Sequence, residues 1–271
     1  MTTQSGVPTI RRMNFPFDDA TIPAHWYDDD RVLTRNADAL HMLFPAGERF
    51  FMRSVRAFVP SIKDPQLLAR VRGFMGQEAM HGREHHRAFS LLDRDGIEYQ
   101  SFLDNYETHW LKRLEAKAHP LTNLAVTCAL EHLTATLGAS SFSDPMLQRA
   151  HPTMRNLMLW HAAEEVEHKS VAYDVYEAMG GGYVRRVLAM VVALTLLMVM
   201  WQRGTRHLLN QDGGLTRADM RALRKKVQTE GRDLLADFRR AAVVYMRPGF
   251  HPNDIDDAHL AYDYFAAQAI A

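Results

Sequence analysis

The sequence contains a single cysteine, no excess of either charge and no alternating runs of the kind that form β-strands. Cys128 cannot form an internal disulfide, which is typical of a reducing compartment and predicts a cytoplasmic protein. Lysine plus arginine number 32, and aspartate plus glutamate also number 32. Because no basic excess is available to neutralise phosphates, we expect no nucleic-acid partner. The first residues also lack the apolar core of a signal peptide.

Prolines and glycines stand at the ends of long segments with helical periodicity, so the sequence predicts an all-α protein. Asp64–Pro65 is typical of a helix cap followed by proline in the first turn, and other prolines are interpreted in the same way. The predicted helices cover about residues 45–59, 65–94, 99–117, 120–141, a short stretch from 145, 152–179, 187–201, 216–246 and 255–271. We expect one domain, divided into an N-terminal arm over 1–40, a helix bundle over 41–182 and a helical C-terminal extension over 183–271, packed on the bundle.

Residues 187–201 form a long apolar run without a charge, flanked by Arg185, Arg186 and Arg203. The run is shorter than the ~20 residues that span a bilayer. One interpretation is a buried helix or a homodimer interface. The other is a helix that makes peripheral contact with a membrane or walls a channel for a lipid-like substrate. The sequence leaves both open.

Two histidines out of fourteen have a glutamate three residues before them. These pairs are Glu78 with His81 and Glu165 with His168. A spacing of three places both side chains on one helical face, one turn apart. Carboxylate-bridged di-metal helix bundles use this Glu-x-x-His unit twice and add one glutamate from each of two further helices.

Glu48 and Glu131 supply the two further glutamates, because each precedes one Glu-x-x-His unit and is flanked by apolar residues. Two divalent ions held close together need anionic bridges to offset their repulsion, and each imidazole adds a neutral nitrogen ligand. Mixed oxygen and nitrogen ligands suit iron, with manganese as the alternative, better than zinc. The sequence therefore predicts a dinuclear site with two metal ions.

Two more histidines extend the pattern along the same helical faces. His161 lies four residues before Glu165, and His85 lies four residues after His81. We expect His161 to be a metal ligand and His85 to be either a ligand or a residue that supports one. Glu164 is also one turn from His161, and we expect it to support a ligand rather than to bind metal. Glu167 should lie on the opposite face, exposed or in a salt bridge.

The ligand pattern resembles the ferritin-like di-iron proteins, and His161 in the H-x-x-x-E-x-x-H pattern is similar to the extra histidine of the aromatic amine N-oxygenases. Five blocks also resemble a bacterial family described as predicted metal-dependent hydrolases: F-P-x-G-E-R-F-F, G-Q-E-x-x-H, L-E-H-x-T-A, W-H-x-x-E-E-x-E-H-K and R-P-G-F-H-P. The first resemblance implies a four-helix bundle with a di-iron site, to which additional C-terminal helices are joined.

We expect a di-iron, O2-activating oxygenase or oxidase that acts on a hydrophobic small molecule such as an acyl, sterol or aromatic compound. No G-x-G-x-x-G fingerprint is present, so electrons would come from an external donor. One alternative is a binuclear metal-dependent hydrolase of esters or phosphoesters. A second alternative is a non-catalytic, ferritin-like iron-binding protein.

Overall fold

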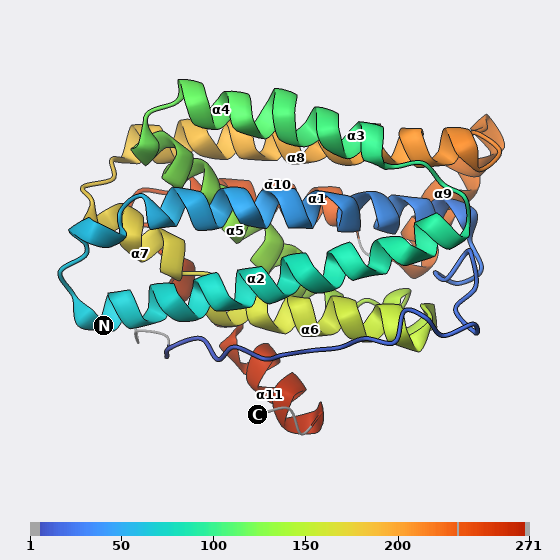
Figure 1. Cartoon of the computed structure of the whole chain (residues 1–271), viewed down its shortest axis with the longest axis horizontal. Coiled ribbons are helices and arrows are strands. Elements are labelled where there is room, and N and C mark those ends of the chain that lie inside the picture. The colour runs from blue at the N-terminus through green and yellow to red at the C-terminus, as the bar shows by residue number, and fades with distance from the viewer. Residues whose placement is uncertain (1–5, 232, 269–271) are drawn as a thin grey trace.

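The computed structural model describes residues 6–231 and 233–268, which fold into helices and connecting loops (Figure 1). These residues form no β-sheet, and an isolated bridge joins Tyr27 to Ala150. The all-α class expected from the sequence is confirmed. The helices are α1 (Arg31–Arg56), η1 (Val59–Ser61), α2 (Pro65–Arg94), α3 (Gln100–Asn105), the π-helical η2 (Tyr106–Leu111), α4 (Lys112–Lys117), α5 (Pro120–Ser141), η3 (Leu147–Arg149), α6 (Pro152–His168), α7 (Val171–Ala178), α8 (Tyr183–Gln211), α9 (Arg217–Glu230), α10 (Leu234–Tyr245), η4 (Pro252–Asp254) and α11 (Ala258–Gln268).

Side-chain caps fix where the bundle helices begin. Asp30 accepts hydrogen bonds from backbone amides in the first turn of α1, and Asp64 does the same for α2. The rings of His119 and His151 cap α5 and α6, each followed by a proline in the first helical position. A capping side chain satisfies amides that have no partner inside the helix, and proline has no amide to satisfy there.

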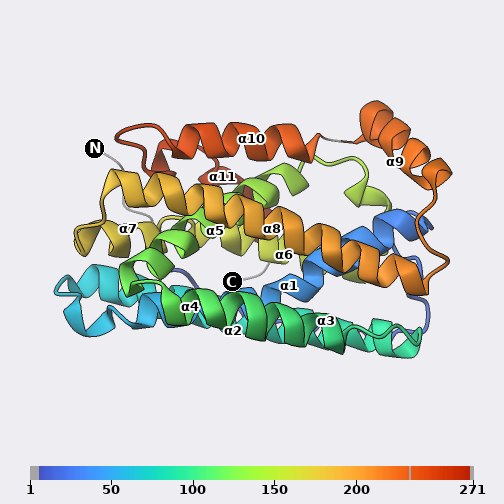
Figure 2. The ribbon, with the colours of Figure 1, turned by 90° about the horizontal axis from the view of Figure 1, so that it is seen from above.

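Four long helices, α1, α2, α5 and α6, pack into a bundle through the α1–α2, α5–α6, α1–α5 and α2–α6 contacts. The remaining long helix, α8, lies across α1 and α5, with α10 beside it (Figure 2). On the opposite side of the molecule, α11 packs against α6. The centre of the bundle is therefore enclosed on most sides by other helices.

The segment before α1 runs as an extended strap beneath α2 and α6 (Figure 1). Gly73 and Gly76 of α2 make room for it, because a Cβ at Gly73 would lie 2.5 Å from the Pro8 carbonyl oxygen and one at Gly76 would lie 2.2 Å from Ile10 Cδ1. The strap is thus fitted to the surface of α2 and brings residues near the N-terminus close to the bundle.

Several helix boundaries differ from those predicted. The helix expected to begin at Pro45 begins at Arg31, and Pro45 lies inside it. The helix predicted over 152–179 stops at His168 and restarts as α7, and the one predicted over 216–246 is divided into α9 and α10. The division of the chain at residues 40 and 182 stays a prediction, although α1 starts inside the segment assigned to the arm.

Candidate metal centre

The seven predicted ligands come together at the centre of the bundle from four helices. They are Glu48 from α1, Glu78 and His81 from α2, Glu131 from α5, and His161, Glu165 and His168 from α6. None of these residues is more than 4% exposed. Charged residues are rarely buried so completely unless they are paired or bind metal.

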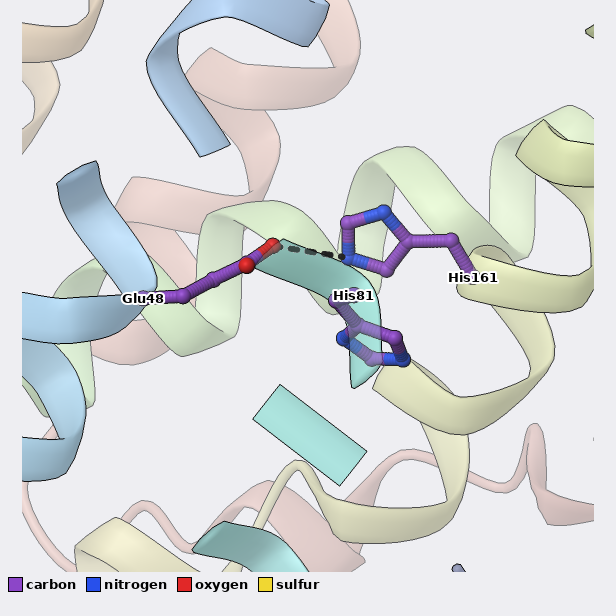
Figure 3. A group of neighbouring side chains, drawn as sticks. All are labelled: Glu48, His81 and His161. Carbon is purple, nitrogen blue, oxygen red and sulfur yellow. Dashed lines mark ion pairs between the residues drawn. The ribbon is translucent and has the colours of Figure 1, made fainter. Parts of the chain in front are cut away.

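Glu48, His81 and His161 form one half of the cluster (Figure 3). Each offers a ligand atom, and these atoms lie within 4.8 Å of one another. The Glu48 Oε1 atom is 3.8 Å from His161 Nε2. This half combines one carboxylate with two imidazoles.

Glu78, Glu131 and His168 form the other half. The Nε2 atom of His168 lies 3.1 Å from Glu78 Oε1 and 3.3 Å from Glu131 Oε2. This half combines two carboxylates with one imidazole.

Glu165 lies between the two halves. Its Oε1 atom is 2.8 Å from His161 Nε2, 3.6 Å from His168 Nε2 and 3.7 Å from His81 Nδ1. The hydroxyl of Thr134 donates a hydrogen bond to the other oxygen, Oε2. A carboxylate in this position faces all three histidines, as a bridging group between two ions would.

Within the described part of the chain, eight buried atoms of these residues have no hydrogen-bond partner. They are both carboxylate oxygens of Glu48, Glu78 and Glu131, together with His81 Nδ1 and His168 Nε2. Buried polar atoms nearly always find a partner, since leaving one without costs ~1–3 kcal/mol. Each of these residues offers one atom within 4.8 Å of ligand atoms of two others, and the donor set of four carboxylates and three imidazoles fits divalent metal ions.

The electrostatics of the cluster also favour a cation. Burial raises the pKa of Glu48 and Glu78 well above the usual range, and neighbouring carboxylates raise it further. Burial raises the pKa of Glu131 to about 7. Burial alone would lower the pKa of His168, but Glu131 and Glu165 raise it well above its ordinary value. Without a cation, protons must offset the repulsion between the carboxylates.

The histidines are held from behind by a second set of residues. His81 Nε2 lies 2.9 Å from Glu164 Oε2, and His168 Nδ1 lies 3.0 Å from Gln77 Oε1. Glu164 therefore contacts His81 on the side that faces away from the centre, which is the position expected for a residue that supports a ligand. Such contacts fix the orientation of an imidazole and the nitrogen that carries its proton.

Arg11, on the strap, joins these two supports. Its guanidinium lies 3.2 Å from Glu164 Oε1 and 2.8 Å from Glu167 Oε2. The Gln77 amide nitrogen donates to Glu167 Oε2 at 2.5 Å. Glu167 forms a salt bridge, which is one of the two outcomes expected for it. Glu164, Arg11, Glu167 and Gln77 thus form a continuous network from His81 to His168.

A row of imidazoles leads away from the cluster on the other side. His161 Nδ1 lies 2.6 Å from His85 Nε2, and His85 Nδ1 lies 2.7 Å from His41 Nδ1. Both nitrogens of His85 thus face other histidines, which places it behind His161.

A cavity of about 210 Å³ adjoins the cluster at this row. His161 and Glu165 line its inner end, beside His85 and His41. Its walls are mainly apolar and come from the bundle and from α8–α10; they include Leu40, Phe44, Leu137, Met146, Leu147, Met158, Trp201, Leu223 and Leu234. Residues of α8, α9 and α10 therefore complete the walls of a cavity that reaches the predicted ligands.

Four residues of the site were not among those predicted from the sequence: Arg11, His41, Gln77 and Thr134. Gln77 and Thr134 belong to the blocks G-Q-E-x-x-H and L-E-H-x-T-A, so a signal for them was present. Arg11 and His41 have no such signal, because their partners lie far away in the sequence. His132 Nε2 donates a hydrogen bond to the Ala241 carbonyl, and this position fits a structural role.

A second group of metal-binding residue types lies at the surface. Asp174, Glu177 and His251 offer atoms within 4.8 Å of one another. Asp174 is already engaged, since Arg70 lies 2.6 Å from Oδ2 and His251 Nε2 lies 2.9 Å from Oδ1. These contacts join α2, α7 and η4 and account for the group as a structural network.

The fold and site together define an all-α bundle protein with a buried carboxylate–histidine cluster that could hold metal. The chain belongs to the family described as predicted metal-dependent hydrolases, which matches residues 9–256. No curated protein and no solved structure matches the chain. The likeness to ferritin-like di-iron proteins therefore rests on the ligand pattern and the bundle.

Proposed function

We propose that the cluster binds two metal ions and that the protein is a dinuclear metalloenzyme. One ion would be held by Glu48, His81 and His161, and the other by Glu131 and His168. Glu78 and Glu165 would lie between them. The observation that carries this proposal is the set of eight buried atoms without a hydrogen-bond partner, on residues whose ligand atoms lie close together in the middle of the bundle.

Charge balance supports two ions rather than one. Four glutamates carry four negative charges when ionised, and two divalent ions carry four positive charges. Burial lowers the pKa of His81 well below its ordinary value, with a further contribution from His161, so this imidazole is neutral and ready to bind metal. A single divalent ion would leave two buried negative charges without compensation.

We propose iron as the metal and O2 activation as the reaction, with an external electron donor. Oxygen and nitrogen ligands without a thiolate suit iron or manganese, and the single cysteine, Cys128, is outside the cluster. Two ferrous ions at this site would supply two electrons to O2. The chain contributes a set of buried ligands and a mainly apolar cavity beside them.

The cavity beside the cluster favours a hydrophobic small molecule as the substrate. Its inner end is formed by His161 and Glu165, so a molecule in the cavity would lie next to the metal centre. The Thr134 hydroxyl donates a hydrogen bond to one oxygen of Glu165, and the other oxygen faces His161, His81 and His168. These contacts orient the carboxylate that separates the two halves of the site.

Hydrolysis is the second candidate, and the description of the family favours it. Two metals can also position a hydroxide for attack on an ester or phosphoester. In that case the mainly apolar cavity would hold an acyl ester better than a phosphoester, because a charged phosphate would leave water for a lining that has no lysine or arginine among the described residues.

Metal analysis followed by anaerobic reduction and O2 exposure separates the two candidates. We expect two irons per chain and an optical and Mössbauer change on exposure to O2. The Glu165→Ala variant should lose metal and this response, while Glu177→Ala, at an exposed position on α7, should keep both. Zinc or manganese without a response to O2, together with turnover of acyl esters, would establish the hydrolase instead.

A further inference from the structure

We propose that the cavity binds an apolar molecule carrying a neutral hydrogen-bond acceptor, and that His41 Nε2–H is the donor that orients it. This inference rests on the proposed function in one respect, namely that His161 binds metal through Nε2. It adds the chemical class of the ligand and a residue that the sequence motifs do not contain.

The position of the His41 proton follows from the row of imidazoles. A metal at His161 Nε2 leaves the proton on Nδ1, which then donates to His85 Nε2 across 2.6 Å. His85 must therefore carry its proton on Nδ1, and donates it to His41 Nδ1 across 2.7 Å. Neutral His41 consequently carries its proton on Nε2.

His41 is neutral at ordinary pH and buried. Its ring is 4% exposed, and burial lowers its pKa to about 3. In the described part of the chain, Nε2 has no hydrogen-bond partner. A buried donor without a partner is costly, so a ligand group that accepts this hydrogen bond would remove the cost.

Other polar groups around the cavity already have partners in the protein. Asn36 donates to Thr205, Ser141 donates to the Leu137 carbonyl, and Asp144 accepts from the Met146 amide. Each of these groups therefore already makes at least one hydrogen bond within the protein. Among the fully buried side-chain polar atoms of the cavity lining, within the described residues, His41 Nε2 is the one without a hydrogen-bond partner, and the other ring nitrogen contacts His85.

The lining of the cavity determines which acceptor fits. A carboxylate or phosphate would be stripped of water among Leu40, Phe44 and Trp201, in a cavity lined by no lysine or arginine among the described residues. A ketone, ether or neutral ester oxygen loses far less on leaving water. The ligand class is therefore a largely apolar molecule with one such oxygen placed near the metal centre.

Calorimetric titration of the metal-loaded protein under anaerobic conditions tests this inference. Acetophenone and α-methylstyrene are suitable probes, because they share one shape and differ in whether an oxygen or a methylene group is present. We expect acetophenone to bind about fivefold more tightly, the value of a net hydrogen bond. The preference should vanish in His41→Phe and persist in His86→Phe, an exposed histidine on α2.

Equal affinity for the two probes, or no binding of either, would overturn the inference, and so would an unchanged preference in His41→Phe. The comparison of probes on the unaltered protein does not depend on the variant folding. Because binding is read without O2 or turnover, a failure of the proposed oxygen chemistry would leave this result interpretable. The metal content of each sample, measured separately, reports on the metal site itself.

A second, independent inference concerns the outward face of α8. Val184, Leu188 and Val191 are 68%, 61% and 54% exposed and lie along one stripe of the helix. Among the described helices, α8 is the one that is long and apolar enough to cross a membrane, yet only 33% of its apolar window is buried. An interior helix would be mostly buried.

Arginines follow this stripe toward the C-terminal end of the helix, and α8 contains no acidic residue. Arg206 continues the stripe, and Arg203 lies beside it, 5.9 Å from the ring of the half-exposed Trp110. The neighbouring helix α10 adds exposed Arg239 and Arg240. Apolar residues bordered by arginine and tryptophan match the interface of an anionic bilayer.

We infer that α8 lies in the plane of an anionic lipid surface. It cannot span the bilayer in this fold, because its other face buries Ala189, Met190 and Ala193 against the bundle. Anionic headgroups would pair with the exposed arginines beside this face.

Co-sedimentation with vesicles tests this face. We expect binding to phosphatidylcholine vesicles that contain phosphatidylglycerol and much weaker binding to pure phosphatidylcholine. Leu188→Asp should abolish binding, whereas Tyr262→Asp, on α11 at the opposite side (Figure 1), should not. Absence of binding to either vesicle, or equal loss in both variants, would overturn the inference. A concentration-dependent dimer sensitive to Leu188→Asp, without vesicle binding, would assign the face to a second copy.

Discussion

Glu48 of α1 rests against Gly82 of α2: a Cβ at Gly82 would lie 3.0 Å from Glu48 Oε2. This distance is closer than nearly all real Cβ contacts, so the carboxylate would have to move by a few tenths of an ångström. Glycine in the middle of a helix costs ~0.5–1 kcal/mol relative to alanine. Gly82, next to His81, thus weakens α2 but leaves room for the predicted ligand Glu48.

We predict that Gly82→Ala has opposite effects on stability and on metal binding. The metal-free protein should become more stable by up to ~1 kcal/mol, because alanine favours the helix. Metal affinity should fall because Glu48 is displaced. Thermal unfolding without metal and titration with ferrous ion measure the two effects.

Gly47→Ala is a matched control, because a Cβ there meets only the Tyr106 hydroxyl at an ordinary 3.7 Å. It should stabilise the helix and leave metal affinity unchanged. Equal metal affinity in the two variants would show that the space at Gly82 does not serve Glu48.

The strap provides a second prediction. Arg11 is the common partner of Glu164 and Glu167, and through them it supports His81 and His168. Arg11→Ala should weaken metal binding by about 10–100-fold, as is typical when a residue behind a ligand is removed. The neighbouring Arg12 is exposed, and Arg12→Ala should bind metal like the unaltered protein.

The ligands could be predicted from the sequence because their contacts follow helical spacing. Glu78 and His81 are three residues apart in a helix, so their side chains share one face independently of the rest of the fold. Arg11 and Glu164 are separated by 153 positions, and their pairing depends on how the strap crosses the bundle. No local pattern encodes such a contact.

The helix boundaries were wrong for a related reason. Pro45 was interpreted as a start because proline usually interrupts a helix, but Asp30 caps a longer helix whose packing tolerates it. The break after His168 contains neither glycine nor proline. Lys169, which follows it, bonds Asp257 and the Ile255 carbonyl near the C-terminus, and tertiary contacts of this kind outweigh local propensity.

Acidification should release the metal. In the metal-free protein burial holds the pKa of Glu131 at about 7, and the pKa of His168 is raised by Glu131 and Glu165. Bound metal must displace these protons, so affinity rises with pH and is lost as pH falls below about 7.

Competition with a chelator, corrected for protonation of the chelator itself, measures this dependence. Each proton displaced adds a tenfold change in affinity per pH unit. We therefore expect at least a tenfold loss between about pH 7 and about pH 6. A flat profile over this range would mean that Glu131 and His168 have already lost their protons without metal.

Removing one buried carboxylate should stabilise the metal-free bundle while destroying the site. Burial and Glu131 raise the pKa of Glu78, so its contribution to stability is greatest when it is protonated and is lost as pH rises through the raised value. In Glu78→Gln the neutral amide avoids this loss. The metal-free variant should melt about 2–4 °C above the metal-free wild type at neutral pH, which corresponds to ~1 kcal/mol.

The advantage of Glu78→Gln should grow with pH, because the wild type is penalised more as its carboxylates are forced to ionise. Added metal should reverse the order, since it stabilises only a protein that binds it. Glu177→Gln, at an exposed position, should change neither melting temperature nor metal response. If metal-free Glu78→Gln melted below the wild type, Glu78 would hold the bundle together through its own contacts. Glu78 would then be a structural residue, and it would have to be removed from the proposed set of metal ligands.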